Sequence, residues 1–220
     1  MIFFDIHTHQ KCKDEIVCIR NIIIDNTTTV NIDKNKYYSA GIHPWYLPEN
    51  NNDALQYLEE LLQEKMLLAV GEIGLDFKQK VLQNNSKKKQ IEVFLQQIEL
   101  AEKYQKPIII HCVKAWDELL KIKAKNRHQL PWIIHGFSKN KRLAAQLLKA
   151  GFLLSYGANI FKSKANAEAL SSSPLNSILF ETDEQSEIDI RKIYQKAARI
   201  LDLDPNELGN QIKENFEKTF

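Results

Sequence analysis

The chain has 220 residues, of which 44% are hydrophobic and 26% charged, and 30 Lys and Arg against 28 Asp and Glu give a formal net charge of +2. This profile excludes a disordered or low-complexity chain and argues against a protein that coats nucleic acid. The apolar stretches fall short of the roughly eighteen residues of a membrane span. The opening segment Met1–His7 lacks the basic and long apolar regions of a secretion signal, so we expect a cytoplasmic protein.

Eight short apolar runs, bounded by polar or turn-forming residues, predict strands. They are Ile2–Ile6, Ile19–Ile24, Tyr37–Ile42, Leu67–Ile73, Pro107–His111, Trp132–His135, Phe152–Tyr156 and Ile178–Glu181. Several runs are continuously apolar rather than alternating, which is typical of strands that are covered on both faces in a parallel sheet.

Helical periodicity begins after the third strand. It predicts helices over Asp53–Lys65, Gln90–Tyr104, Trp116–Lys123, Lys141–Lys149 and Ile188–Leu201, and a last helix that begins at Asp204-Pro205. Eight strands alternating with helices predict an α/β fold of the TIM (β/α)8 barrel class, as one domain of residues 1–220.

Two parts of this barrel are expected to be irregular. The spacings from His7 to Ile24 and from Ile24 to Ile42 are shorter than the roughly 30 residues of a strand–helix–strand unit, so the first two connections are predicted to lack full helices. The lysine-rich segment Lys78–Gln90 is predicted to be an exposed loop that enters a helix.

The three cysteines are Cys12, Cys18 and Cys112, an odd number without C-x-x-C spacing. We therefore expect reduced thiols rather than a disulfide framework. Cys112 adjoins His111, but no separate base remains to activate its thiol, so we interpret it as a packing residue.

The informative polar residues lie at the carboxyl ends of the predicted strands. They are His7 and His9 at the first strand, Glu72 in the fourth, His111 and His135 at the fifth and sixth, and Asp183 after the eighth. In a (β/α)8 barrel these ends form the catalytic face, so the side chains should converge. Four imidazoles and two carboxylates suit Zn²⁺, Mn²⁺ or other borderline divalent ions, and six ligands exceed what one tetrahedral ion with an open position uses. We predict two divalent metal ions that share a carboxylate.

Two of these positions are informative by themselves. His7 and His9 are two residues apart, so their side chains point to the same face of a strand. Glu72 is an ionisable group inside an apolar run, where burial is costly unless the group is paired or binds a metal. His43, which follows Gly41-Ile42 and precedes Pro44, either contacts the substrate or caps a turn.

Seven segments spread along the chain resemble the TatD family of metal-dependent deoxyribonucleases, within the amidohydrolase-like barrels. They are Phe4–His9, Gly41–Pro44, Gly71–Asp76, Ile109–Cys112, Ile134–Ser138, Leu154–Gly157 and Phe180–Asp183. Each motif alone is weak, but their order and spacing together are specific.

The resemblance implies a two-metal centre with His7, His9 and Asp183 on one ion, His111 and His135 on the other, and Glu72 bridging them. It also implies hydrolysis of phosphodiester bonds in DNA ends or short single-stranded DNA by water that the metals activate. With the ions in these places, Asp183 is the natural proton acceptor from that water.

The chain departs from the family pattern after the fifth strand, where Val113 stands in place of a usual arginine. Lys114 is the candidate for binding a phosphate instead, and His43 is the other candidate substrate contact. The lysines of Lys78–Lys89 either extend this site or form a solvated surface, and the second interpretation is favoured.

Two other functions stay open. One is hydrolysis of amides or esters, for example deacylation of charged tRNA, but many such enzymes bridge their metals with a modified lysine where this chain has Glu72. The other is a non-catalytic scaffold, which is disfavoured because all six ligands are present. We expect neither a membrane interaction nor an obligate protein partner.

Overall fold

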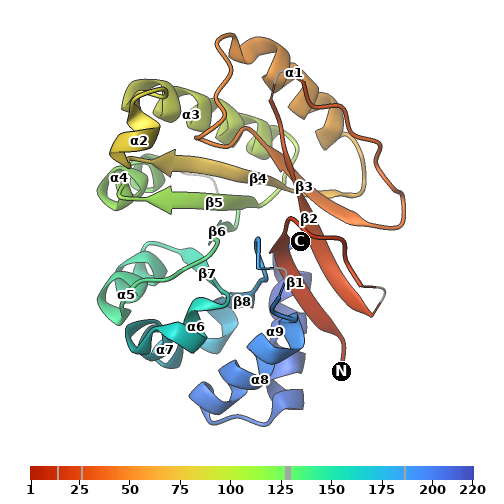
Figure 1. Ribbon diagram of the computed structural model, residues 1–220, viewed down its shortest axis with the longest axis vertical. Coiled ribbons are helices and arrows are strands. Elements are labelled where there is room, and N and C mark those ends of the chain that lie inside the picture. Colours follow the sequence, from red (N-terminus) through yellow and green to blue (C-terminus); the bar gives the residue numbers. More distant parts are fainter. Residues whose placement is uncertain (14, 26, 127–129, 186) are drawn as a thin grey trace. The chain divides into compact units, whose positions relative to one another are not determined.

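The computed structural model describes residues 1–13, 15–25, 27–126, 130–185 and 187–220. Its eight strands are hydrogen-bonded in chain order from β1 to β8 (Figure 1). They are β1 (Phe3–Thr8), β2 (Ile16–Ile23), β3 (Tyr37–Gly41), β4 (Leu67–Asp76), β5 (Ile108–Val113), β6 (Trp132–Ile134), β7 (Phe152–Tyr156) and β8 (Ile178–Phe180). Thr8 of β1 forms a parallel bridge with Asp183, just after β8. Parallel strands in chain order whose last member meets the first have the topology of a (β/α)8 barrel, so the predicted fold class is confirmed.

All six predicted helices are present. They are α1 (Asn51–Leu62), α3 (Lys87–Lys103), α4 (Trp116–Lys125), α5 (Lys141–Lys149), α8 (Ile190–Leu201) and α9 (Pro205–Thr219). Between β1 and β2, and between β2 and β3, the described residues contain no helix, as the short spacings predicted. None of the helices in the described part of the chain is long and apolar enough to cross a membrane.

Four further helical segments were not predicted. They are α2 (Gln79–Leu82), α6 (Asn159–Lys162), α7 (Lys164–Ser171) and the 3-10 helix η1 (Leu175–Ser177). The prediction of a loop over residues 78–90 is therefore wrong for α2 and for the first turn of α3. The side chain of Ser86 accepts a hydrogen bond from the Lys89 N–H, and this cap starts α3 before its first apolar position.

The chain forms two compact units. The first contains Met1–Arg20 and Ile133–Phe220, and the second contains Asn21–Trp132. In the first unit, α8 and α9 pack against β1 and β8, and α5 packs against β7. In the second, α3 packs along β4, and α1 packs against β3 and α3 (Figure 1). The organisation of residues 1–220 as one domain stays a prediction.

The continuous apolar runs are buried, as expected for a parallel sheet. Ile108, Ile109 and Ile110 of β5 have no exposed surface, and burial of each side chain contributes about 1.5–3 kcal/mol. At Gly74 of β4, φ is 141° and a Cβ atom would lie 2.1 Å from the carbonyl oxygen of His111. Only glycine fits there, so Gly74 allows the carboxyl ends of β4 and β5 to pack closely.

The structure corrects the expectation of reduced thiols, because Cys12 and Cys18 form a disulfide with 6.1 Å between their Cα atoms. Cys18 of β2 pairs with Asp5 of β1 in the parallel ladder. The chain must therefore turn back after β1 to start β2, and this return places Cys12 beside Cys18. The cytoplasmic location loses the support of the thiol argument and stays a prediction. Cys112 is buried in β5.

Candidate metal centre

In the first unit, the ends of β1, β6 and β8 bring four predicted ligands together. His7 Nε2 and His9 Nε2 each lie 3.7 Å from Asp183 Oδ1. The ring centroids of His7 and His135 are 4.5 Å apart. Potential ligand atoms of His7, His135 and Asp183 all lie within 4.8 Å of one another. These side chains offer the nitrogen and oxygen donors that a divalent transition metal prefers.

The backbone holds Asp183 on both sides. Its N–H donates to the carbonyl of His7 over 2.9 Å, and its carbonyl accepts the N–H of His9 over 3.2 Å. With φ of 54°, Asp183 lies in the left-handed region, which costs a non-glycine residue roughly 1–2 kcal/mol. Hydrogen bonds to β1 therefore maintain a strained backbone that fixes the Asp183 carboxylate between two histidines.

Glu181 was not predicted as a functional residue. It is fully buried at the end of β8, and its Oε1 accepts the Gly136 N–H over 2.6 Å and lies 3.3 Å from Nδ1 of His135. A carboxylate at one ring nitrogen fixes the orientation of the imidazole and leaves the other nitrogen for an ion. The signal for Glu181 was its place at the end of the predicted strand Ile178–Glu181, as for His111 and His135.

Asp5 of β1 holds the segment that carries Asp183. Its carboxylate accepts the Thr182 N–H over 3.0 Å and the Thr182 hydroxyl over 2.6 Å. Burial raises the pKa of Asp5 to about 7, against the opposing effect of these hydrogen bonds. The pairing ties β1 to the residue that precedes Asp183.

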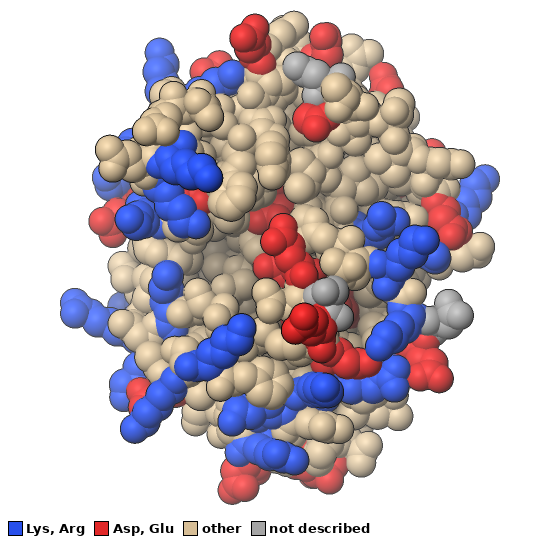
Figure 2. Space-filling view, in the orientation of Figure 1, with Lys and Arg blue, Asp and Glu red and all other residues tan. Residues whose placement is uncertain are grey.

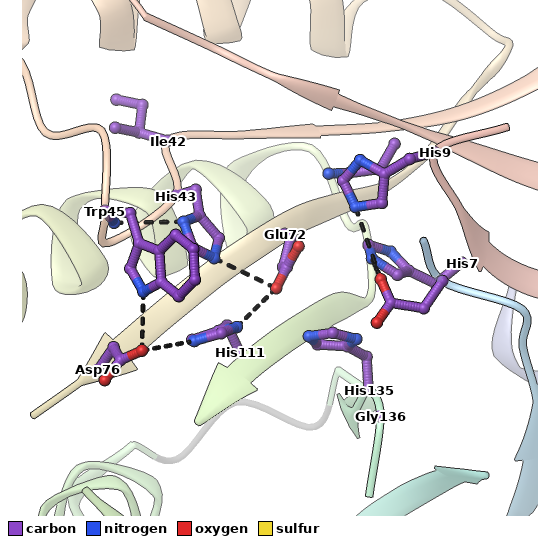
Figure 3. Close-up of polar contacts among 12 residues, drawn as sticks. His7, His9, Ile42, His43, Trp45, Glu72, Asp76, His111, His135 and Gly136 are labelled. Carbon is purple, nitrogen blue, oxygen red and sulfur yellow. Dashed lines mark hydrogen bonds and ion pairs between the residues drawn. The ribbon is translucent and has the colours of Figure 1, made fainter. Parts of the chain in front are cut away.

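In the second unit, β4 and β5 place Glu72 beside His111, and the turn after β3 adds His43. Glu72 Oε1 lies 2.7 Å from His111 Nδ1 and 3.3 Å from His43 Nε2. Figure 3 shows the Glu72 carboxylate directed at both rings. Potential ligand atoms of the three residues lie within 4.8 Å of one another.

His43 caps a turn, which is one of the two roles expected for it from the sequence. The Trp45 N–H donates to His43 Nδ1 over 3.2 Å, and the Tyr46 N–H donates to the His43 carbonyl over 2.9 Å. Because Nδ1 accepts a hydrogen bond, a neutral His43 carries its proton on Nε2, which faces Glu72. His43 in this tautomer orients Glu72, and its contact with a substrate stays a prediction.

His111 has a carboxylate at each ring nitrogen. Nδ1 lies 2.7 Å from Glu72 Oε1, and Nε2 lies 3.2 Å from Asp76 Oδ2. A neutral imidazole has one N–H, so one of its nitrogens would direct a lone pair at a carboxylate oxygen. A cation shared by Nδ1 and Glu72 removes this repulsion. The donor set of this cluster therefore fits a divalent ion.

Asp76 is a second functional residue that sequence reasoning missed. It is fully buried, and Oδ2 accepts the indole N–H of Trp45 over 2.7 Å as well as facing His111. Burial raises the pKa of Asp76, but hydrogen bonds from His111, the Lys78 N–H and Trp45 outweigh it and lower the pKa to about 2. Asp76 is therefore an anion at neutral pH and holds the His111 ring in place.

Two glutamines of α3 fix the strand ends that carry this cluster. Gln97 accepts the Ile42 N–H over 2.7 Å and donates to the Ile42 carbonyl over 3.1 Å. Gln90 accepts the Asp76 N–H over 2.8 Å and donates to the Asp76 carbonyl over 2.9 Å. Both side-chain amides are buried. Each binds the N–H and the carbonyl of one residue, as a neighbouring strand would, at a point where backbone pairing between strands ends.

The remaining predicted contact and one unpredicted lysine lie near these clusters. Lys114 directly follows β5, is exposed and has φ of 55°; its role in substrate binding stays a prediction. In the first unit, a small pocket of about 70 Å³ is lined by Asp183, Asn159 and Lys162 among others. Figure 2 shows basic side chains over α6, α7 and α8, around the acidic segment between β8 and α8. Lys162 gave no signal in the sequence because its short helix lacks apolar periodicity.

Within each unit, the predicted ligands lie close to one another. His7, His9, His135 and Asp183 lie together in the first, and Glu72 and His111 in the second. The arrangement of all six around two ions stays a prediction.

Comparison with known proteins agrees with these observations. The family model described as TatD related DNase matches residues 17–220. The chain is 32% identical over 203 residues to a protein of Buchnera aphidicola subsp. Baizongia pistaciae that is named an uncharacterized metal-dependent hydrolase. This match spans 86% of this chain and 75% of the relative. The chain is 30% identical over 154 residues to the uncharacterized metal-dependent hydrolase YjjV of Escherichia coli K12, which covers 67% of this chain and 57% of the relative.

Solved structures share the fold. The structure of YjjV, a TatD homologue from Escherichia coli K12, matches with a TM-score of 0.83 at 20% identity, over 99% of this chain and 97% of that chain. A TatD family hydrolase from Entamoeba histolytica matches with a TM-score of 0.77 at 17% identity, with the same coverage. Since the family model matches nearly the whole chain, the protein belongs to the family of TatD-related DNases.

Proposed function

We propose that the protein is a metal-dependent hydrolase that cleaves phosphodiester bonds of DNA, at ends or in short single strands. The observation that carries the proposal is the environment of His111, whose two ring nitrogens face the carboxylates of Glu72 and Asp76 at 2.7 and 3.2 Å. Such a cluster is costly to bury without a cation. The description of the family as DNases supports cleavage of DNA, and the names of the relatives support metal-dependent hydrolysis.

In this proposal the centre holds two divalent ions. His7, His9 and Asp183 bind one ion, His111 and His135 bind the other, and Glu72 is shared. Bound divalent ions would lower the pKa of a water molecule and neutralise charge on phosphoryl oxygens. Zn²⁺ and Mn²⁺ suit this mixture of nitrogen and oxygen ligands, and Mg²⁺ stays a candidate because phosphoryl transfer commonly uses it.

The protein side chains orient the reactants and move the proton. Asp183 accepts a proton from the attacking water, and the hydrogen bonds from β1 hold its carboxylate in place for this. The water oxygen forms a bond to phosphorus, and the bond from phosphorus to one ester oxygen breaks. A proton then passes to the leaving oxygen, so the products are a phosphomonoester and an alcohol. Lys114 and Lys162 supply positive charge for the substrate phosphates.

Replacement of Glu72 tests this proposal. We expect Glu72→Ala to lose binding of Mn²⁺ in titration calorimetry and hydrolysis of single-stranded DNA labelled at the 3′ or the 5′ end. Glu92→Ala is the matched control, because Glu92 is an exposed carboxylate on α3. It should bind two ions per chain and cleave DNA like the wild type.

Three outcomes would contradict the proposal. Full hydrolysis by Glu72→Ala would overturn the proposed role of Glu72 as the carboxylate that two ions share. Hydrolysis of acyl esters or charged tRNA by the wild type, without cleavage of DNA, would assign the protein to acyl hydrolases instead. Purified wild-type protein that binds no divalent ion would indicate a non-catalytic scaffold.

A further inference from the structure

Two exposed aromatic side chains follow His43 at the end of β3. Trp45 is 43% exposed and Tyr46 is 49% exposed, and their ring centroids are 6.4 Å apart. The Trp45 ring also lies 5.4 Å from the ring of His43 and 6.1 Å from the ring of His111. Large apolar rings beside a catalytic cluster are typical of ligand-binding surfaces rather than of ordinary solvated surface.

The Trp45 ring is held rigidly although it is exposed. Its indole N–H donates to buried Asp76 over 2.7 Å, as Figure 3 shows. The side-chain amide of Asn85 donates to the carbonyls of Pro44 and Trp45 over 3.1 and 3.0 Å, which fixes the backbone of the turn. A ring that is already ordered loses little conformational entropy when a ligand stacks on it.

Positive charge lies next to the rings. Lys78 Nζ lies 5.5 Å from the centroid of the Trp45 ring and 3.8 Å from Asp76 Oδ2, and nearly half of the Lys78 side chain is exposed. Figure 2 shows further basic side chains over α2 and the start of α3, where the sequence has Lys80, Lys87 and Lys88. An aromatic surface with adjacent lysines matches a ligand that carries a flat ring next to a phosphate.

We propose that Trp45 and Tyr46 form a stacking surface for an unpaired nucleobase of a DNA strand, and that Lys78 contacts the neighbouring phosphate. This inference rests on the proposed phosphodiesterase function and adds the mode of substrate recognition. It explains a preference for single strands, because a paired base does not offer its faces to a protein ring. In this proposal, the segment after β3 contacts the substrate through the rings of Trp45 and Tyr46 rather than through His43.

A comparison of strands with and without bases tests the proposal. The probes are a fluorescent oligothymidylate and an abasic strand of the same length, with phosphorothioate linkages so that binding is measured without cleavage. Stacking on an aromatic side chain contributes about 1–3 kcal/mol for each base, so the wild type should bind the oligothymidylate roughly 5- to 150-fold more tightly. Equal affinity for both strands would overturn the proposal.

Variants assign the effect to the two rings. Trp45→Ala and Tyr46→Ala should each weaken binding of the oligothymidylate and leave binding of the abasic strand unchanged, whereas Trp45→Phe should recover most of the affinity. Tyr46→Ala is the more decisive variant, because the Tyr46 side chain takes no part in the hydrogen bonds to Asp76. Tyr37→Ala is the matched control, since Tyr37 is 38% exposed at the opposite end of β3.

The phosphate contact has its own readout. Lys78→Ala should weaken binding of both strands and reduce the slope of log affinity against log salt concentration by about 1. A single-stranded RNA of the same length and thymidine monophosphate are included as probes. Equal binding of RNA would extend the recognition to both nucleic acids, which supports base stacking, whereas binding of the monophosphate alone would overturn recognition of a strand.

The two proposals fail in different ways. If the wild type prefers strands with bases but cleaves no DNA, the hydrolytic function is wrong and the stacking surface stands. If DNA is cleaved and Tyr46→Ala keeps the preference for bases, the stacking surface is wrong and the hydrolytic function stands. Titration of each variant with Mn²⁺ shows whether a loss of binding arises from the metal cluster.

Discussion

Asp76 Oδ2 lies 3.2 Å from Nε2 of His111, on the side of the ring opposite Nδ1. This contact keeps the His111 ring oriented with Nδ1 toward Glu72, so Asp76→Asn should weaken binding of a divalent ion about 10- to 100-fold. Titration calorimetry with Mn²⁺ measures the change. Asp33→Asn, at an exposed carboxylate, should bind Mn²⁺ like the wild type. If Asp76→Asn binds Mn²⁺ with wild-type affinity, the contact between Asp76 and His111 has no effect on ion binding.

Loss of either α3 glutamine should destabilise the protein. Gln97→Ala removes both partners of the buried Ile42 backbone groups, and Gln90→Ala does the same at Asp76. Each substitution should lower the free energy of unfolding by about 1–3 kcal/mol, because buried polar groups lose their hydrogen bonds. Urea unfolding measures this change. Glu99→Ala, at an exposed position of the same helix, should stay close to the wild type.

The Cys12–Cys18 disulfide should stabilise the protein modestly. It closes a loop with a sequence separation of 6, and the chain-entropy model gives about 2 kcal/mol for a loop of this size. Urea unfolding of the wild type and of the double variant Cys12→Ser, Cys18→Ser should therefore differ in oxidising buffer. The difference should vanish when a dithiol reductant is present, and a difference that persists would assign the effect to the serines.

The ion pair between Lys13 and Asp189 should contribute stability that depends on pH. Lys13 Nζ lies 2.7 Å from Asp189 Oδ2, and this hydrogen bond lowers the pKa of Asp189 below its ordinary value of 3.8. A lowered pKa in the folded state means that the contribution is present above about pH 4 and is lost as the pH falls through the lowered pKa.

Lys13→Ala tests this dependence. It should reduce the free energy of unfolding by about 0.5–1 kcal/mol at neutral pH, since both side chains are partly exposed. The difference from the wild type should shrink as the pH falls below 4 in a series of urea titrations. Lys11→Ala, in the same loop, should show no such trend. A constant difference across the series would refute the ion pair as its cause.

The strands and most helices could be predicted because burial leaves a pattern in the sequence. Runs such as Ile108–Ile110 are continuously apolar, which marks them as buried strands. Helix α5 was predicted with its observed bounds because its apolar residues follow the helical period. The helices α6 and α7 were missed because they are short and contain few large apolar residues. Their ends depend on a serine cap at Ser163 and on packing against neighbouring helices.

The candidate site was predictable where an ionisable residue interrupts, ends or directly follows a predicted strand. Glu72 and His111 were found in this way. Asp76 gave no such signal, because the predicted strand ended at Ile73, whereas β4 extends to Asp76. Its importance depends on contacts with His111 and Trp45, which are far from it in the sequence. The Cys12–Cys18 pair was wrongly interpreted for the same reason, since spacing does not reveal how tightly the chain turns back.

Helix α3 sets the positions of two separate chain segments at once. Gln90 and Gln97 are seven residues apart, which corresponds to about 10.5 Å along a helix, and they hold the backbone at Asp76 and at Ile42. Insertion or deletion of one residue between them would rotate one amide by about 100° around the helix axis and release one strand end. The number of residues between the two glutamines is therefore constrained as strictly as the spacing of a binding motif, although both glutamines bind only backbone groups in these contacts.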